Sequence, residues 1–242
     1  MPFLVAGDPT LAQSLVAAKL LAAAGADVLE VGVPFSDPVA DGPVIQAAGQ
    51  RALAKGMSLK KAIGFVAALR ADGVTIPVVL FTYLNPILRM GTEAFARACK
   101  KAEATGVLIV DLPAEDSTET EGILKKHGLE LVLLASPTTT DERLKLIAKA
   151  NGTAIYYVSR EGVTGVRKGL ALNIADRLKH VRRMTKKPLM VGFGVAEASQ
   201  ARALALHADG VVVGSALVRA NYEGGPGAVR RLAKKLIGAL EI

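Results

Sequence analysis

The sequence predicts an α/β protein that folds as one closed (β/α)₈ barrel of the TIM type. Apolar runs rich in β-branched residues alternate with amphipathic runs rich in Ala, Leu and Lys along the whole chain. This alternation gives eight strand–helix pairs in 242 residues, a usual size for such a barrel. The composition is 51% hydrophobic, which suits parallel strands that are covered by helices.

The expected strands are short apolar runs: Phe3–Ala6, Val28–Val33, Val78–Tyr83, Val107–Asp111, Leu131–Ala135, Ala154–Ser159, Leu189–Gly192 and Gly210–Val213. The expected helices follow them: Leu11–Ala24, Val44–Leu53 with Leu59–Ala71, Glu93–Ala104, Ser117–His127, Asp141–Ala150, Ile174–Met184, Glu197–Leu206 and Ala228–Leu240. A doubly wound open sheet is the alternative, but the turn after the first strand, Ala6–Thr10, lacks a dinucleotide-binding glycine pattern. No break in composition divides the chain, so residues 1–242 are expected to form one domain.

The net charge of +8 is divided unevenly along the chain. Residues 1–121 hold 10 basic and 13 acidic side chains, whereas residues 122–242 hold 20 and 9. Solvated helix faces explain this excess, and so does attraction of an anionic ligand to the C-terminal half. Nucleic acid is not expected as a partner, because the basic residues match no nucleic-acid-binding motif.

One cysteine, Cys99, lies in an expected helix, so neither an internal disulfide nor a multi-cysteine metal site is expected. The first residues are not a basic segment followed by a long apolar run, and no apolar run reaches the length of a membrane span. We therefore expect a soluble, cytoplasmic protein with no membrane association.

Glu30 places a carboxyl group inside an otherwise apolar strand. Side chains alternate along a strand, so Val28, Glu30 and Gly32 share one face. If the larger apolar set meets the helices, Glu30 points into the barrel, where loss of water raises a carboxyl pKa and allows acid catalysis. The alternative is a structural ion pair, for which only Arg160, just after the sixth strand, comes close.

The loop after this strand contains Ser36-Asp37-Pro38, which is typical of a turn. Asp41 precedes Gly42-Pro43 and a helical run, so taken alone it is expected to cap that helix. Active sites of (β/α)₈ barrels lie at the C-terminal ends of the strands, which is where this loop falls.

Three glycine-rich corners follow the last three strands: Gly162–Gly165, Gly192-Phe193-Gly194 and Gly214-Ser215-Ala216. Glycine lets the backbone approach a ligand closely, and N–H groups at a helix start bind anions. The loops after strands seven and eight are the usual phosphate site of such barrels. The pattern favours a phosphorylated substrate.

Tyr156, inside the sixth strand, is expected to pack in the core, although its phenol could also bond a substrate hydroxyl or an acid. Phe193, between two glycines, is expected to be a pocket wall. The three histidines share no metal-ligand spacing, so no metal site is expected.

The segment 29–43 resembles the signature of the tryptophan synthase α subunit family. Other motifs agree in order along nearly the whole chain: Gly7-Asp8-Pro9, Tyr83-Leu84-Asn85-Pro86, Asp111-Leu112-Pro113, Ser159–Gly165 and the glycine corners. The resemblance implies a lyase of tryptophan biosynthesis that cleaves indole-3-glycerol phosphate to indole and glyceraldehyde 3-phosphate by a retro-aldol reaction.

The resemblance also implies three catalytic residues. Glu30 is the implied general acid–base, which protonates indole C3 and takes the proton of the C3′ hydroxyl. Asp41 binds the indole N–H and stabilises the cationic indolenine, because a carboxylate beside a developing cation lowers the barrier. Tyr156 matches the tyrosine of the family's site.

The implied substrate-binding residues are Phe3, Leu108, Thr164, Gly165, Gly192, Phe193, Gly194, Gly214 and Ser215. Of these, Phe3, Leu108 and Phe193 line the indole pocket, and the glycine corners hold the phosphate. Loops 34–41 and 160–169 are the implied lids that also meet a β subunit in an α2β2 heterotetramer, with Pro34, Asp37 and Pro38 on the first. The α subunit is expected to use no cofactor, and pyridoxal phosphate belongs to the β partner.

Two departures from the family pattern stand out. A helix usually precedes the first strand and covers the bottom of the barrel, whereas here Met1 nearly begins the strand, so lowered stability is expected. Members of the family are also more often acidic. A stand-alone lyase and a non-catalytic activator of a β subunit are the alternative functions, and the two acids argue against the second.

Overall fold

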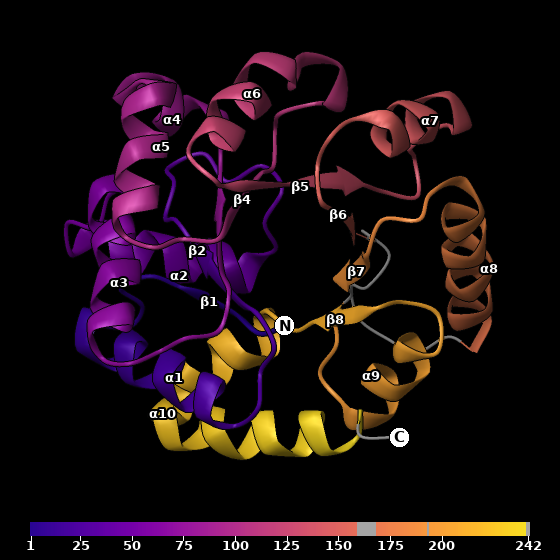
Figure 1. The fold of residues 1–242 in the computed structure, drawn as a ribbon. Coiled ribbons are helices and arrows are strands. Elements are labelled where there is room, and N and C mark those ends of the chain that lie inside the picture. Colours follow the sequence, from indigo (N-terminus) through magenta and orange to yellow (C-terminus); the bar gives the residue numbers. More distant parts are fainter. Residues whose placement is uncertain (159–167, 193, 241–242) are drawn as a thin grey trace.

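The computed structural model describes residues 1–158, 168–192 and 194–240, and its centre is a ring of eight parallel strands (Figure 1). The strands are β1 (Phe3–Val5), β2 (Leu29–Gly32), β3 (Val78–Thr82), β4 (Gly106–Ile109), β5 (Glu130–Ala135), β6 (Ala154–Val158), β7 (Leu189–Gly192) and β8 (Gly210–Val212). Each strand pairs with the next one in the chain. The N–H of Phe3 donates to the carbonyl of Val213 at 2.8 Å, which joins the end of β8 to β1. The expected barrel is confirmed, and the open sheet is wrong.

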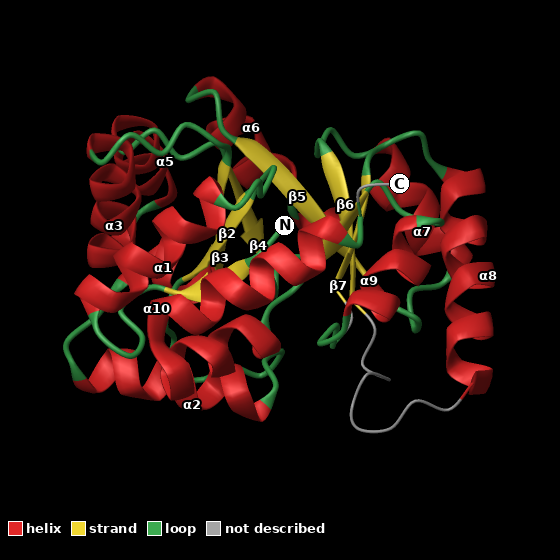
Figure 2. Cartoon of the chain, turned by 90° about the horizontal axis from the view of Figure 1, so that it is seen from below, coloured by secondary structure: helices red, strands yellow, loops and turns green. Residues whose placement is uncertain are grey.

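The helices surround the strands on the outside of the ring (Figure 2). They are α1 (Leu11–Ala23), α2 (Pro43–Ala54), α3 (Leu59–Ala71), α4 (Leu84–Met90), α5 (Thr92–Lys101), α6 (Thr118–Lys126), α7 (Asp141–Lys149), α8 (Lys168–Met184), α9 (Ala198–Ala205) and α10 (Ser215–Gly238), with a 3₁₀ helix at Ala114–Asp116. Within the described ranges, no helix is both long and apolar enough to cross a lipid bilayer.

The expected strands agree with the observed ones to within two residues at each end, but several helices differ. Helix α8 begins at Lys168 instead of Ile174, and α5 ends at Lys101 instead of Ala104. The short helix α4 follows β3, where no helix was expected. Its Pro86 stands in the first turn, where the missing N–H would have had no acceptor within the helix. The last helix begins at Ser215 instead of Ala228, and Gly225, at φ +66°, divides it in two. A left-handed glycine before Pro226 ends one helix and starts the next.

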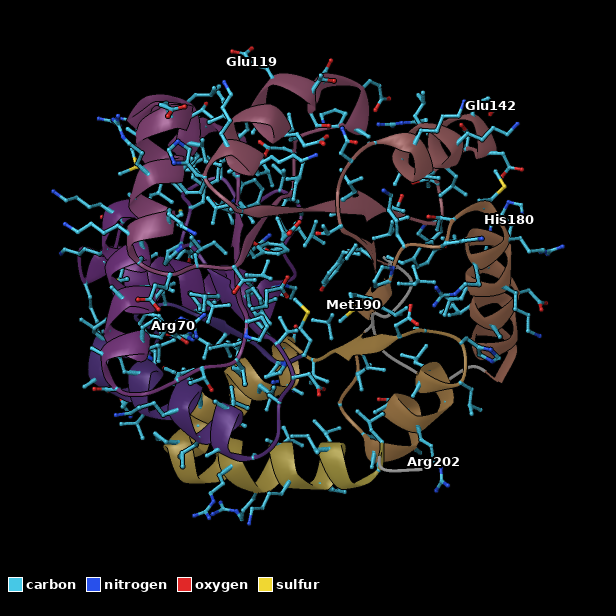
Figure 3. All side chains as sticks on the ribbon, in the orientation of Figure 1. Arg70, Glu119, Glu142, His180, Met190 and Arg202 are labelled. Atoms are coloured by element: carbon cyan, nitrogen blue, oxygen red, sulfur yellow. The ribbon has the colours of Figure 1, made fainter. Side chains whose placement is uncertain are left out.

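The strand register decides which side chains point into the ring. Phe3 pairs with Glu30, and Glu30 pairs with Val79, so the three side chains point to the same side of the sheet. Met190 also lies within the ring of strands, whereas charged side chains such as Glu119 lie on the outside (Figure 3). The larger apolar side chains of β2 meet the helices, as expected, and Glu30 is left inside.

A single arginine ties three chain segments together at the end of the barrel opposite the loops that follow the strands. Arg70, near the end of α3, donates from Nη1 to the carbonyls of Val74 and Ile76, both at 2.7 Å. Its Nε and Nη2 donate to the carbonyl of Glu103 at 3.1 and 3.0 Å. The entry to β3 and the turn before β4 are thereby fixed to one helix end.

Replacing this side chain is expected to destabilise the barrel. Arg70→Met removes four hydrogen bonds from a charged donor, and a loss of about 2–3 kcal/mol in the free energy of unfolding should follow. Urea denaturation measures it. Lys19→Met is the control, because it breaks the ion pair between Lys19 and Asp72, whose side chains are 40% and 45% exposed. The free energy of unfolding should fall by less than about 1 kcal/mol in this variant. Equal losses in the two variants would contradict the interpretation.

Candidate active site

Glu30 lies in β2 with no exposed surface, and its carboxyl oxygens have no hydrogen-bond partner among the described residues. Burial raises the pKa of this carboxyl group to about 8; the positive charge of the N-terminal amino group opposes part of this shift, and the negative charge of Asp41 adds to it. The group is therefore mostly protonated at neutral pH. No ion pair of Glu30 occurs within the described ranges. Arg160, the candidate partner, falls outside them.

Asp41 does not cap helix α2, so the expectation drawn from its position alone is wrong. Gly42 occupies the capping position, where no side chain bonds the helix. The Asp41 carboxylate instead accepts a hydrogen bond from the phenol of Tyr83 at 3.1 Å. Burial raises the pKa of Asp41 to about 6, and the bond from Tyr83 opposes part of that rise. Asp41 is thus mostly ionised at neutral pH.

Tyr83 holds the loop that carries Asp41. From the sequence, Tyr83 was named only within a motif, and no role was predicted for it. Its phenolic oxygen also accepts the N–H of Ala40 at 3.2 Å, and its ring stacks on Phe35 with centroids 4.9 Å apart. From the other side, the Gln46 side-chain amide donates to the carbonyl of Asp41 at 2.9 Å. Tyr83 directly follows β3, and this place at the catalytic end of a strand is the signal that could have identified it.

A hollow lies beside Asp41 between β1, β2, β3 and α2. Its walls include Phe3, Pro34, Phe35, Pro38, Ile45 and Phe81. The rings of Phe3 and Phe81 meet edge to face at 5.5 Å. Gly32 makes room for Phe3, because a Cβ at this position would collide with the phenyl ring. The apolar, aromatic lining suits a flat apolar group whose polar edge faces Asp41.

Among the described residues, Leu108 and Asp37 do not line this hollow. Leu108 is level with Phe81 in the strand register and is fully buried. Asp37 is exposed on the loop. Of the residues expected at this end of the site, the structure therefore brings together Phe3, Pro34 and Pro38.

Tyr156 is buried in β6 and shares the barrel interior with the two acids. Burial raises the pKa of its phenol well above the ordinary value, and the charges of Glu30 and Asp41 raise it further. The phenol thus keeps its proton and can donate it in a hydrogen bond. Gly192 leaves space for the phenol, because a Cβ there would collide with the Tyr156 hydroxyl.

The corners after β7 and β8 are neighbours, because Gly192 pairs with Val212 in the register. Gly194 adopts φ +38°, a left-handed conformation that favours glycine. Gly214 occupies the capping position of α10, and Ser215 is its first residue. The first N–H groups of a helix have no acceptor within it and attract anions. Of the other expected phosphate and pocket residues, Thr164, Gly165 and Phe193 lie outside the described residues.

The described residues contain no group of three or more His, Cys, Asp or Glu side chains that could hold a metal ion. The ring nitrogens of His127 and His180 instead lie 2.6 and 2.8 Å from carboxylates of Glu93 and Asp141. Cys99 is buried in α5, and burial raises the pKa of its thiol to about 12, so it is unsuited to nucleophilic chemistry.

Fold and site together define a (β/α)₈-barrel enzyme with two unlike carboxyl groups at its catalytic end. The model of the family described as tryptophan synthase alpha chain matches residues 1–237. A tryptophan synthase alpha chain of Xanthomonas axonopodis pv. citri is 49% identical over 224 residues, which cover 92% of this chain and 84% of that one. The corresponding chain of a Picosynechococcus species is 46% identical over 227 residues, covering 93% and 86%.

Solved structures give the same result. Tryptophan synthase subunit alpha of Legionella pneumophila superposes with a TM-score of 0.91 at 38% identity, covering 99% of this chain and 91% of that one. A chain of the tryptophan synthase complex of Pyrococcus furiosus gives 0.87 at 37% identity, covering 98% and 96%. The chain belongs to the tryptophan synthase alpha chain family. The lyase function implied by the sequence, retro-aldol cleavage of indole-3-glycerol phosphate, is confirmed at the level of this family.

The burial of Glu30 predicts a pH-dependent cost to stability. An exposed Glu has a pKa of about 4.3, whereas that of folded Glu30 is about 8. Between these values the folded chain keeps a proton that the unfolded chain has lost, so the free energy of unfolding falls as pH rises through this window. Glu30→Gln removes the penalty and should be more stable than the wild type by about 3–5 kcal/mol near pH 8.

Urea denaturation at about pH 5 and pH 8 measures this difference. The advantage of Glu30→Gln should shrink toward the lower pH, because the pKa difference between the folded and unfolded states acts over fewer pH units there. Glu119→Gln, on the outer surface, is the control and should change stability by less than about 0.5 kcal/mol at either pH. A gain for Glu30→Gln that does not vary with pH would contradict the assigned protonation of Glu30.

Proposed function

We propose that this chain cleaves indole-3-glycerol phosphate with Glu30 as the proton donor and acceptor and Asp41 as the partner of the indole N–H. The observation that carries this proposal is the difference between the two carboxyl environments, which give pKa values of about 8 and about 6. At neutral pH one group is an acid and the other a carboxylate. Two carboxyl groups with separated pKa values can take the two different roles that the reaction requires.

The reaction requires a proton at indole C3 before the bond between C3 and C3′ breaks. Protonated Glu30 supplies that proton, and the ring becomes a cationic indolenine. The Asp41 carboxylate, beside the ring N–H, stabilises the positive charge. Glu30, now a carboxylate, takes the proton of the C3′ hydroxyl as C3–C3′ breaks and its electron pair returns to the ring. Indole and an aldehyde leave, and Glu30 is again protonated, so protons and electrons balance within the chain.

The substrate contacts follow from this orientation. We place the indole ring against Phe3 and next to Asp41, with Leu108 and Phe193 as further walls. We place the phosphate at Gly194, Gly214 and Ser215, with Thr164, Gly165 and Gly192 contributing. The apolar hollow supports the first placement, and the start of α10 supports the second. The protonated phenol of Tyr156 then has a substrate oxygen or Glu30 as its acceptor.

Removing either acid tests the proposal. Glu30→Gln and Asp41→Asn should each lower the rate of indole release more than about 100-fold, because positioned proton transfer and charge stabilisation contribute at least that much. The affinity for glycerol 3-phosphate, measured by calorimetry, should change less than about 3-fold. Near-normal turnover in either variant would refute the assignment.

The pH profile of the wild-type chain tests the same assignment without mutation. Activity requires ionised Asp41, so kcat/KM should fall as pH drops below about 6. It also requires protonated Glu30, so kcat/KM should fall as pH rises above about 8. If kcat/KM stays level through one of these pH values, the residue assigned to that value does not need the proposed protonation state.

We also propose a cytoplasmic α2β2 assembly with a β subunit, which carries the pyridoxal phosphate, while the α chain works by carboxyl groups alone. A partner bound at the catalytic end would cover apolar side chains that are exposed there. Val39, in loop 34–41, is 66% exposed, and Leu88, on α4, is 59% exposed. The similarity to a chain of the Pyrococcus furiosus complex also supports it. A stand-alone lyase is the second candidate. The other implied lid, loop 160–169, lies largely outside the described residues.

Leu88→Asp distinguishes these candidates. It should weaken binding of a tryptophan synthase β subunit at least 10-fold and reduce the stimulation of indole release, because a charge would be buried against the partner. Leu206→Asp is the matched control, since Leu206 is 67% exposed at the end of α9, on the opposite side of the barrel. Full activity without any β subunit, together with no effect of Leu88→Asp, would favour the stand-alone lyase.

A further inference from the structure

An ion pair between partly exposed Arg51 and buried Asp8 joins α2 to the loop between β1 and α1. Arg51, in α2, donates from Nε to Oδ1 of Asp8 at 2.7 Å and from Nη2 to Oδ2 at 3.0 Å. The Asp8 side chain is only 1% exposed. Two parallel charge-assisted bonds fix direction as well as distance, so they orient α2 relative to this loop.

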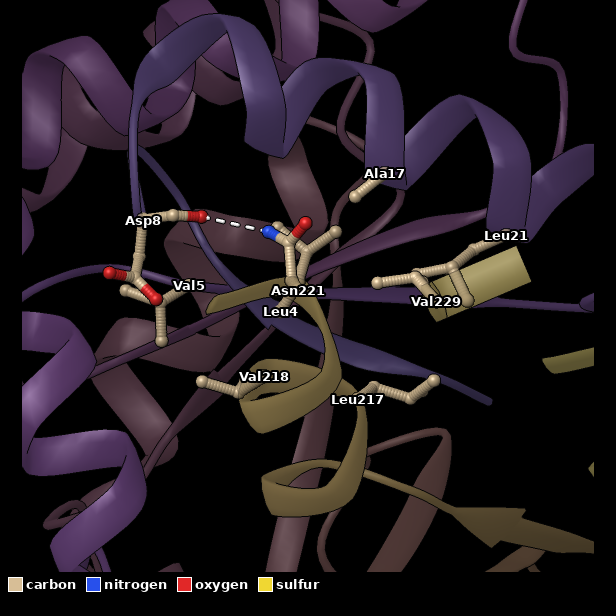
Figure 4. Close-up of a pocket in the computed structure, with 9 residues that line it drawn as sticks. All are labelled: Leu4, Val5, Asp8, Ala17, Leu21, Leu217, Val218, Asn221 and Val229. Carbon is tan, nitrogen blue, oxygen red and sulfur yellow. Dashed lines mark hydrogen bonds between the residues drawn. The ribbon is translucent and has the colours of Figure 1, made fainter. Parts of the chain in front are cut away.

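Helix α10 meets the same ion pair through two neighbouring residues. The ring of Tyr222 lies against the Arg51 guanidinium, whose central carbon is 3.8 Å from the ring centroid. The side-chain amide of Asn221 donates to the backbone carbonyl of Asp8 at 3.0 Å, among apolar side chains of β1, α1 and α10 (Figure 4). We name these four residues, Asp8, Arg51, Asn221 and Tyr222, the Asp8 clasp.

The two helices joined by the clasp begin at the two ends of the proposed site. Helix α2 starts at Pro43, directly beyond Asp41 and Gly42. Helix α10 starts at Ser215, in the corner proposed for the phosphate. A rotation or shift of either helix would therefore move one end of the site relative to the other.

Few side chains of α2 are fully buried. It packs chiefly against α10 and β1, and the buried residues of the helix are Ala48, Gly49 and Ala52. Such small side chains allow close approach but interlock weakly, since little apolar surface is buried by each. The Asp8–Arg51 pair is thus the bidentate polar contact between this helix and the loop after β1, beside the bond from Lys55 to the carbonyl of Pro9.

We propose that the Asp8 clasp sets the spacing between the indole end and the phosphate end of the site, and that Arg51 and Asn221 are positioning residues of the reaction. The inference rests on the proposed function, because it takes Asp41 and the Gly214–Ser215 corner as those two ends. One substrate molecule must reach both ends at once. An error in their spacing lowers the affinity that is gained when both ends bind one molecule, and it lowers the rate that is gained from correct alignment. Each end alone still binds its own fragment of the substrate.

The test compares the whole substrate with its two fragments. Arg51→Lys keeps the charge but cannot form the two parallel bonds. In this variant kcat/KM for indole-3-glycerol phosphate should fall at least 10-fold. The dissociation constants of indole and of glycerol 3-phosphate, each measured alone by calorimetry, should change less than about 3-fold. A general loosening of the fold would weaken the fragments as well.

A second variant changes the clasp in the other helix, α10. Asn221→Ala removes the bond from α10 to Asp8 but leaves the Asp8–Arg51 pair in place, so it should show the same separation of effects with a smaller loss. Lys19→Met, which breaks an exposed ion pair, is the control and should leave kcat/KM within about 2-fold. All chains are assayed in full length, alone and with a β subunit, well below their measured melting temperatures.

Two results would overturn the inference: Arg51→Lys and Asn221→Ala behaving like Lys19→Met, or fragment affinities falling as much as kcat/KM. Glu30→Gln, assayed in parallel, separates this failure from a failure of the proposed function. If Glu30→Gln still releases indole, the proposed function is wrong. If Glu30→Gln is inactive while the clasp variants have normal kcat/KM, only the clasp inference is wrong.

Discussion

The removal of the Glu30 carboxyl group from water is the constraint on which the catalytic end depends. The strands on either side place Phe3 and Val79 at its level, and no described side chain gives its oxygens a hydrogen bond. In such surroundings the neutral acid is the stable form, because ionisation would leave an unpaired charge in the interior. The acidity of Glu30 is thus a property of the closed barrel, since an open sheet would let water reach the same residue. Burying this carboxyl group costs free energy, and the stability that the barrel gains from its apolar core must also offset that cost.

Asp41 differs because it lies on a loop and has a partner. The Tyr83 phenol bonds both the Asp41 carboxylate and the N–H of Ala40, so the position of the loop and the ionisation of the acid are linked. A displacement of the loop that breaks one bond breaks the other, and the carboxylate then loses the donor that favours its charged form. The site therefore sets two protonation states by two separate means: the strand interior for Glu30, and a phenol from the next strand for Asp41.

The parts of this arrangement that local sequence determines were predictable. Alternation along β2 was enough to direct Glu30 inward, and the βα periodicity was enough to give all eight strands. The partner of Asp41 was not predictable, because capping rules use only neighbours in the chain, whereas Tyr83 is 42 residues away. The same holds for the bond between Asn221 and Asp8, which spans 213 residues. Helix α4 was missed because it is short and has a proline in its first turn, which local rules take as a break.

The uneven charge of the chain had two explanations, and the geometry separates them. Basic residues such as Lys179 and Lys234 lie exposed on α8 and α10, in the layer that surrounds the strands. A helix with its side chains is about 10 Å across, which is about one Debye length at physiological salt. Charges on the outer faces lie in solvent at about this distance or more from a ligand at the barrel mouth, so salt weakens their attraction to it. Anion binding at the corners after β7 and β8 must come from groups that touch the ligand, namely the free N–H groups at the start of α10 and the glycines that let a phosphate approach them. The basic surface is better explained as solvated helix faces, and the local backbone, not the net charge, favours an anionic substrate.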